Sequence, residues 1–156
     1  MPDELVVLFT AMTPIGELRA AIPLALVGYH MDWPTALLLG IVGNLIPIPL
    51  ILLGLRTLGE RFERRPDVIG RVLRWRTERI QRVWGARVGR YHFWGVMLLV
   101  AIPLPLTGAW TGALAVWALR VDVRVGLAAI AAGVVVAGII VTALTQAGIG
   151  IISITG

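Results

Sequence analysis

Four apolar stretches divide the chain, and two of them are continuous. Residues 35–55 form an uncharged run, and residues 125–145 form a second uncharged run of equal length. A helix needs ~20 apolar residues to cross the ~30 Å hydrocarbon core of a bilayer. Each run therefore predicts one membrane-spanning helix. Within the first run, Asn44, Pro47 and Pro49 indicate either a kink with a polar contact or ordinary helix packing.

The other two stretches are each interrupted near the middle, the first at residues 13–19 and the second at residues 103–108. Arms of about ten residues, at ~1.5 Å per residue, reach about half way through a bilayer. Both stretches therefore predict re-entrant helical hairpins with tips near the midplane. The alternative is that each stretch is one proline-kinked helix, which gives a protein with four spans. The predicted tip residues are Thr13, Pro14, Gly16 and Pro23 in the first hairpin, and Pro103 and Pro105 in the second.

Positive charge is concentrated between the two halves of the chain. All 14 basic residues are arginines, and most of them lie in residues 56–90. Because arginines mark the cytoplasmic side, this segment is expected inside. Two hairpins then place both termini outside and Arg120 and Arg124 inside, whereas four spans would place these two arginines outside. The charges favour the hairpins and a multi-pass protein of the cell inner (plasma) membrane.

The two halves also match one another when the sequence is shifted by 90 residues. Gly43 then coincides with Gly133, and Asp32, at the start of the first run, coincides with Asp122. The two aspartates suit helix capping. A hairpin plus one span crosses the membrane once, so a second copy must be inverted relative to the first, as in many secondary transporters.

These patterns predict an all-α integral membrane protein with two inverted repeats, each a re-entrant helical hairpin plus one transmembrane helix. A single membrane domain is expected over residues 1–156, divided into repeat 1 (1–57), a basic amphipathic cytoplasmic linker helix (58–92) and inverted repeat 2 (93–156).

The linker combines an apolar helical face with an arginine face. Trp75 and Trp84 suit the headgroup level of the inner leaflet, and attraction to anionic lipids at ~1 kcal/mol per arginine explains the basic charge without nucleic acid. We therefore expect the bilayer and its anionic lipids as partners. The apolar face consists of Ile69, Val72, Leu73, Ile80, Val83 and Trp84.

Composition narrows the possible chemistry. Apolar residues make up 58% of the chain and charged residues 15%, which does not suit an ordinary soluble domain. The chain has no cysteine and two separated histidines, so no disulfide, metal site or cofactor is expected. No nucleophile with a neighbouring base is visible, which argues against an enzyme.

Glu17 and Arg19 are the only charged residues within either hairpin. Residues two apart in a helix do not face each other, so the two side chains need not pair; Glu17 can face a cavity while Arg19 meets the second hairpin. An intramembrane carboxylate is costly and suits proton coupling or substrate binding. The alternatives are a structural salt bridge, or a carboxylate that only complements a helix N-terminus.

The residues beside each tip predict helix starts. Thr13 followed by Pro14 suits an N-cap and first helical position, and Thr107 with Gly108 suits the same role in the second hairpin. Two helix N-termini and Arg19 would then form a cradle for an anion, although Glu17 could instead attract a cation. The adjacent Trp110 and Thr111 either contact a substrate or pack in the core.

Two motifs resemble those of the small multidrug export protein family, and the resemblance covers nearly the whole chain. They are residues 14–23 (PIGELRAAIP) and residues 103–112 (PLPLTGAWTG). That family is thought to be similar in fold to the DedA membrane proteins, which have two facing re-entrant hairpins and are linked to proton-driven translocation of lipid phosphates such as undecaprenyl phosphate. The resemblance implies that the functional residues are Glu17, Arg19, Thr107, Gly108, Trp110 and Thr111.

We therefore expect a proton-coupled secondary transporter of an amphipathic or lipid-like substrate, either a lipid phosphate or a drug. Because two full spans surround the site incompletely, we also expect a homodimer, packed through the small residues Ala129, Gly133 and Ala137. The alternatives are a membrane-organising or interaction protein that does not transport, and a four-span small drug/proton antiporter.

Overall fold

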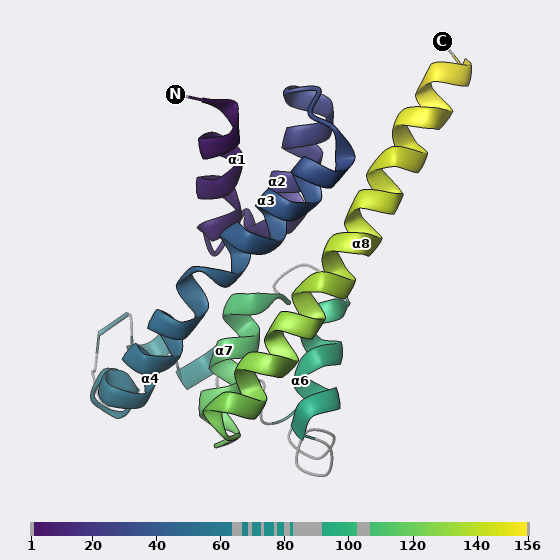
Figure 1. Ribbon diagram of the computed structural model, residues 1–156. Coiled ribbons are helices and arrows are strands. Elements are labelled where there is room, and N and C mark those ends of the chain that lie inside the picture. Colours follow the sequence, from purple (N-terminus) through teal and green to yellow (C-terminus); the bar gives the residue numbers. More distant parts are fainter. Residues whose placement is uncertain are drawn as a thin grey trace.

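The described part of the chain is helical throughout. The computed structural model describes residues 2–63, 67–68, 70–72, 74–76, 78–79, 82, 92–102 and 107–155, and no strand occurs in these ranges. Along the chain its elements are α1 (Asp3–Met12), α2 (Glu17–Pro23), the π-helical turn η1 (Leu24–Gly28), α3 (Trp33–Leu45), α4 (Pro47–Glu63), α6 (His92–Ala101), α7 (Ala109–Ala118) and α8 (Val123–Thr155) (Figure 1).

Two segments are long and apolar enough to cross a membrane. They are Trp33–Leu58, which comprises 26 residues in α3 and α4, and Val123–Gly150, which comprises 28 residues of α8. Both contain the runs from which spans are predicted. The helical assignment of the first segment breaks at Ile46, because Pro47 has no N–H to donate to the carbonyl of Gly43. The interruption lies beside the prolines, where the sequence indicates a kink or ordinary helix packing.

The two interrupted stretches fold back on themselves. α1 and α2 pack against each other and against α3, and α6 and α7 pack against each other and against α8. Figure 1 shows that each pair forms a helical hairpin and not a single kinked helix. The two hairpins open toward opposite ends of the molecule, and their tips lie near its middle (Figure 1).

Equivalent positions of the two halves make equivalent contacts. A Cβ atom on Gly43 would lie 2.7 Å from the carbonyl oxygen of Leu8 in α1, and a Cβ atom on Gly133 would lie 2.7 Å from that of Met97 in α6. In both halves a glycine therefore allows the long helix to approach the first hairpin arm closely. This shared packing supports the internal repeat that the shift of 90 residues predicts.

The small residues of α8 pack within the chain. Ala129 and Ala137 are 0% and 1% exposed, and Gly133 lies against Val100 and Met97 of α6. Small residues do permit the close helix approach that the sequence predicts, but the neighbour is α6. The expected dimer interface through Ala129, Gly133 and Ala137 is therefore wrong, because this face is already covered.

Two details of the first tip also differ from expectation. α2 begins at Glu17 and not at Pro14, because the positive φ of Glu17 (48°) interrupts the helical backbone there. Thr13 Oγ1 still accepts from the Gly16 amide (3.0 Å), as an N-cap residue does, and donates to the Thr10 carbonyl (2.8 Å), which closes a turn over residues 13–16. Pro23 is not a tip residue: it ends α2, and the π-helical turn η1 follows it. Because Pro23 has no N–H, the regular helical ladder is interrupted there.

Pro103 and Pro105, predicted for the second tip, lie outside the described residues, as do Ile69, Leu73, Ile80, Val83 and Trp84 of the predicted linker helix. The described linker positions between 68 and 82 are helical. Trp75 is half-exposed, and the guanidinium of Arg79 lies 5.5 Å from the centre of its ring.

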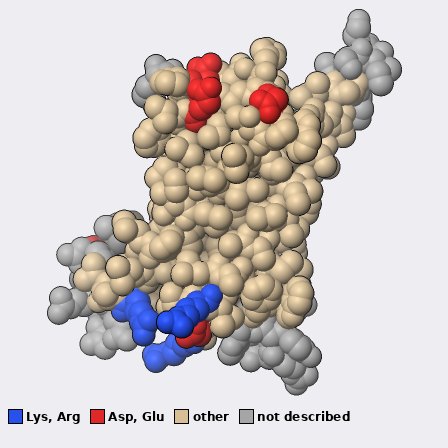
Figure 2. Space-filling model, in the orientation of Figure 1, with Lys and Arg blue, Asp and Glu red and all other residues tan. Residues whose placement is uncertain are grey.

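Charges lie at the two ends of the molecule. In the view of Figure 2, acidic side chains gather at the end where α1 begins, basic side chains gather at the opposite end together with an acidic group, and the visible described surface between the two ends is uncharged. Asp32 caps α3 by accepting from the Thr35 amide (3.1 Å) and hydroxyl (3.0 Å), and Asp122 accepts from the Arg124 amide (2.9 Å). The predicted capping roles are confirmed.

Candidate functional site

Glu17 and Arg19 form an ion pair at the tip of the first hairpin. Arg19 Nη1 lies 3.3 Å from Glu17 Oε2, and Glu17 is only 6% exposed. The expectation that residues two apart need not pair applies to a regular helix. Glu17 is the first residue of α2 and has a positive φ of 48°, so its side chain does not follow the helical spacing. The local backbone thus brings the two charges together.

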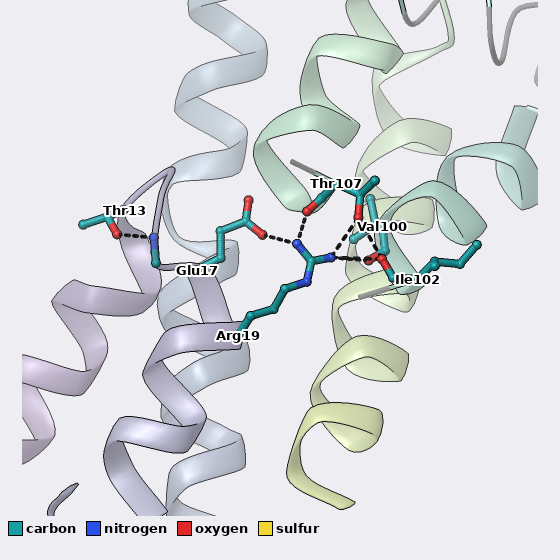
Figure 3. A network of polar contacts seen from close by, with 7 residues as sticks. Thr13, Glu17, Arg19, Val100, Ile102 and Thr107 are labelled. Atoms are coloured by element: carbon teal, nitrogen blue, oxygen red, sulfur yellow. Dashed lines mark hydrogen bonds and ion pairs between the residues drawn. The ribbon is translucent and has the colours of Figure 1, made fainter. Parts of the chain in front are cut away.

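Arg19 reaches across to the second hairpin (Figure 3). Its Nη1 donates to the carbonyl of Thr107, and its Nη2 lies 3.2 Å from the carbonyl oxygen of Ile102 and 3.4 Å from that of Val100. Nη2 also lies 3.3 Å from Thr107 Oγ1. The Val100 and Ile102 carbonyls are at the C-terminal end of α6, where the helix dipole is negative. The guanidinium therefore neutralises the exposed carbonyls of a helix end.

Glu17 meets the other broken end of the second hairpin. Its carboxylate accepts from the backbone amides of Ala109 and Trp110, the first residues of α7. Gly108, which precedes them with φ 151°, leaves the space that the carboxylate occupies: a Cβ atom here would lie 2.6 Å from Glu17 Oε1. The acidic residue of the pair thus binds the positive end of α7, while the basic residue binds the negative end of α6.

This arrangement changes which anion the predicted cradle holds. The N-terminus of α7 and Arg19 do lie together, as the sequence predicts, but the anion between them is Glu17 itself, from the other hairpin. The sequence predicts that Glu17 faces a cavity, or that it complements the N-terminus of its own helix, and not that it meets the N-terminus of α7. The available signal was Gly108, whose missing side chain leaves room for a group that comes from outside α7.

The remaining predicted residues lie on or next to α7. Thr107 precedes the helix and also donates from its hydroxyl to the Ile102 carbonyl (2.8 Å). Trp110 and Thr111 follow in its first turn, and both are partly buried. The indole Nε1 of Trp110 is buried and has no hydrogen-bond partner in the described part of the chain, and the same holds for Nε of Arg19.

One more polar residue in the interior belongs to the first span. Asn44 is 1% exposed, and its Oδ1 has no hydrogen-bond partner among the described residues. The sequence indicates either a kink with a polar contact or ordinary helix packing for this residue. No group of three histidine, cysteine, aspartate or glutamate residues that could hold a metal ion occurs among the described residues.

The fold and the site thus define an all-helical protein with two candidate membrane spans and two hairpins, in which the Glu17–Arg19 ion pair of the first hairpin contacts the second. A family model described as "Putative small multi-drug export protein" matches residues 17–140, a range that begins at Glu17 and includes the whole first span, the second hairpin and most of the second span. The chain belongs to this family and is a membrane protein. No curated protein and no solved structure matches the chain, so the similarity to DedA proteins stays a prediction.

Proposed function

We propose that the protein is a secondary transporter that moves an amphipathic or lipid-like substrate, a lipid phosphate or a drug, through a site between the two hairpin tips. The observation that carries this proposal is the buried carboxylate of Glu17, held between Arg19 and the N-terminus of α7. Membership of an export family agrees with transport in general.

Proton coupling follows from the contacts of Glu17. While it is ionised, the carboxylate attracts both the guanidinium and the α7 amides, and so joins the two hairpins. Protonation removes this negative charge and weakens both attractions, because charge-assisted hydrogen bonds are about twice as strong as neutral ones. The tips can then separate, and Arg19 and the α7 N-terminus become available to the headgroup of a substrate.

The same proposal includes the membrane arrangement. The arms of both hairpins have about ten residues, or ~15 Å, which is half the hydrocarbon thickness. We take the hairpins as re-entrant and the two halves as inverted repeats. The arginine-rich end faces the cytoplasm and its anionic lipids, and both termini face outside; the separation of acidic and basic ends in Figure 2 supports this orientation.

A homodimer remains part of the proposal because two full spans alone surround the site incompletely. Its interface lies elsewhere than on the Ala129 and Ala137 face, which α6 and the rest of the chain cover.

Transport is tested in proteoliposomes of defined lipids with an imposed pH gradient. The probes are a short-chain NBD-labelled phosphatidic acid, which represents lipid phosphates, and ethidium, which represents cationic drugs. The wild type should move at least one probe faster with the gradient than without it. In Glu17→Gln this acceleration should be lost, because a neutral carboxamide cannot load and release the proton.

Asp32→Asn is the matched control. It makes the same chemical change at an exposed acid whose amide can still cap α3, and it should transport like the wild type. Undiminished proton coupling in Glu17→Gln would remove Glu17 from the mechanism. Failure of the wild type to move either probe would instead favour the membrane-organising alternative.

A further inference from the structure

The side-chain carbonyl oxygen of Asn44 is buried in the apolar interior. Asn44 is the only asparagine of the chain, it lies inside the 26-residue span, and its Oδ1 is buried without a hydrogen-bond partner in the described residues. Burying a polar group without a partner is unfavourable, and such groups in folded proteins call for an explanation. A kink does not explain it, since Pro47 accounts for the break at Ile46.

The contacts of its neighbours place Asn44 at the level of the hairpin tips. One turn earlier, Gly40 lies against Leu18 and Ile22 of α2, and Gly43 lies against Ala11, next to the end of α1. α2 and α3 run in opposite directions (Figure 1), so one turn beyond Gly40 corresponds to the beginning of α2, where Glu17 lies.

The contacts of the following helix, α4, also locate Asn44. Ile48, one turn after Asn44, is 1% exposed at the start of α4, and α4 packs against α7. Asn44 therefore lies where the chain passes from the first hairpin to α7, whose N-terminus holds the Glu17 carboxylate.

The repeat shows that packing does not require a polar residue here. The equivalent position 90 residues later is Val134, which is 0% exposed and follows Gly133 just as Asn44 follows Gly43. The second half fills the position with an apolar side chain of slightly larger volume. Packing at this position therefore does not require the carboxamide that the first half has.

We propose that Asn44 is a ligand-binding residue of the same site, and that its side-chain carbonyl accepts a hydrogen bond from the headgroup bound by Arg19 and the N-terminus of α7. This inference rests on the proposed function and narrows the substrate class. The ligand is an amphipathic molecule whose headgroup carries an O–H or N–H donor, such as the monoanion of a phosphate monoester.

The test compares two NBD-labelled lipids in the same proteoliposomes at pH 6. Phosphatidic acid is a monoester with a second pKa of about 6, so a large fraction carries a P–OH donor. Phosphatidylmethanol is a diester and carries no such donor. The wild type should transport phosphatidic acid about tenfold faster than the diester, a ratio that corresponds to one hydrogen bond. In Asn44→Val the two rates should become equal.

A thermal unfolding measurement separates this role from a structural one. Asn44→Val should unfold at the same temperature as the wild type or higher, because it replaces a side chain whose buried carbonyl oxygen has no partner in the described residues with the residue found at position 134. Gln146→Val removes an exposed amide from α8 and should change neither the ratio nor the stability.

Two results would overturn the inference while leaving the proposed function intact: an unchanged preference for phosphatidic acid in Asn44→Val, or a loss of transport of both lipids together with a lower unfolding temperature. If the wild type transports neither of the two lipids nor ethidium, the proposed function is refuted, and the inference with it.

Discussion

Replacement of Gly108 by alanine tests how closely the two hairpins fit. An alanine Cβ would lie 2.5 Å from Glu17 Cδ and 2.6 Å from Oε1, about an ångström inside ordinary contact distance. The backbone at φ 151° and ψ −167° adds strain, because this region is essentially restricted to glycine and costs about 1–3 kcal/mol for other residues. Gly108→Ala should therefore lower the free energy of unfolding by about 2 kcal/mol or more.

Unfolding by SDS in mixed micelles, followed by tryptophan fluorescence, measures this loss. The matched control is Gly54→Ala in α4, where a Cβ would meet nothing within 4 Å. Alanine is a better helix former than glycine, so this variant should be unchanged or up to about 1 kcal/mol more stable. If Gly108→Ala were as stable as Gly54→Ala, the carboxylate of Glu17 would not lie at the α7 N-terminus.

Three further predictions concern the ion pair, the α6–α8 contact and the α3 cap. Arg19→Gln leaves the charge of the buried Glu17 carboxylate uncompensated and should lower the free energy of unfolding by about 3 kcal/mol. In a double-mutant cycle, the variant that also carries Glu17→Gln should recover much of this loss. Gly133→Val should destabilise by about 1–3 kcal/mol through overpacking against α6, while Gly148→Val, in open space, should not. The Thr35 hydroxyl and amide lower the pKa of Asp32 below its ordinary value. The ionised carboxylate therefore stabilises the fold fully at a pH above the ordinary pKa of aspartate, and this stabilisation is lost as the pH falls through the lowered pKa of Asp32. Asp32→Ala should be less stable than the wild type at pH 6, and the difference in unfolding free energy between the two should shrink in strong acid.

The sequence predicts the features that depend on local composition. Uncharged runs of sufficient length identify both spans, interruptions at Thr13–Gly16 and before Thr107 identify both hairpins, and the isolated charges of Glu17 and Arg19 identify the centre of the site. Capping by Asp32 also follows from local rules, because an aspartate and the next helical turn contain the whole interaction.

The sequence does not predict contacts that depend on distant residues. The positive φ of Glu17 and its position at the start of α7 arise only when two hairpins, about 90 residues apart, meet at their tips. The small residues around Gly133 indicate close packing, but nothing in their spacing distinguishes α6 of the same chain from a second copy. Likewise, Pro23 resembles a tip residue in sequence, although the turn is already closed at Gly16.

Comparison of positions 90 residues apart, the spacing of the predicted repeat, indicates which positions the packing requires. Gly43 and Gly133 make the same close approach in both halves and are explained by packing. Asn44 and Val134 occupy equivalent buried positions but differ in polarity. Differences between the halves therefore point to the site more directly than the features they share.

The central claim is that both hairpins enter and leave the membrane on one side, so that their tips meet inside it. The chain contains no cysteine, so single cysteines at Asp3, Asp32, Arg79 and Asp122 can be labelled on intact cells with a membrane-impermeant maleimide. The account predicts labelling at 3 and 32 and none at 79 and 122 unless the cells are opened. Labelling at 32 and 122 but not at 3 or 79 would show four ordinary spans and would contradict the midplane site.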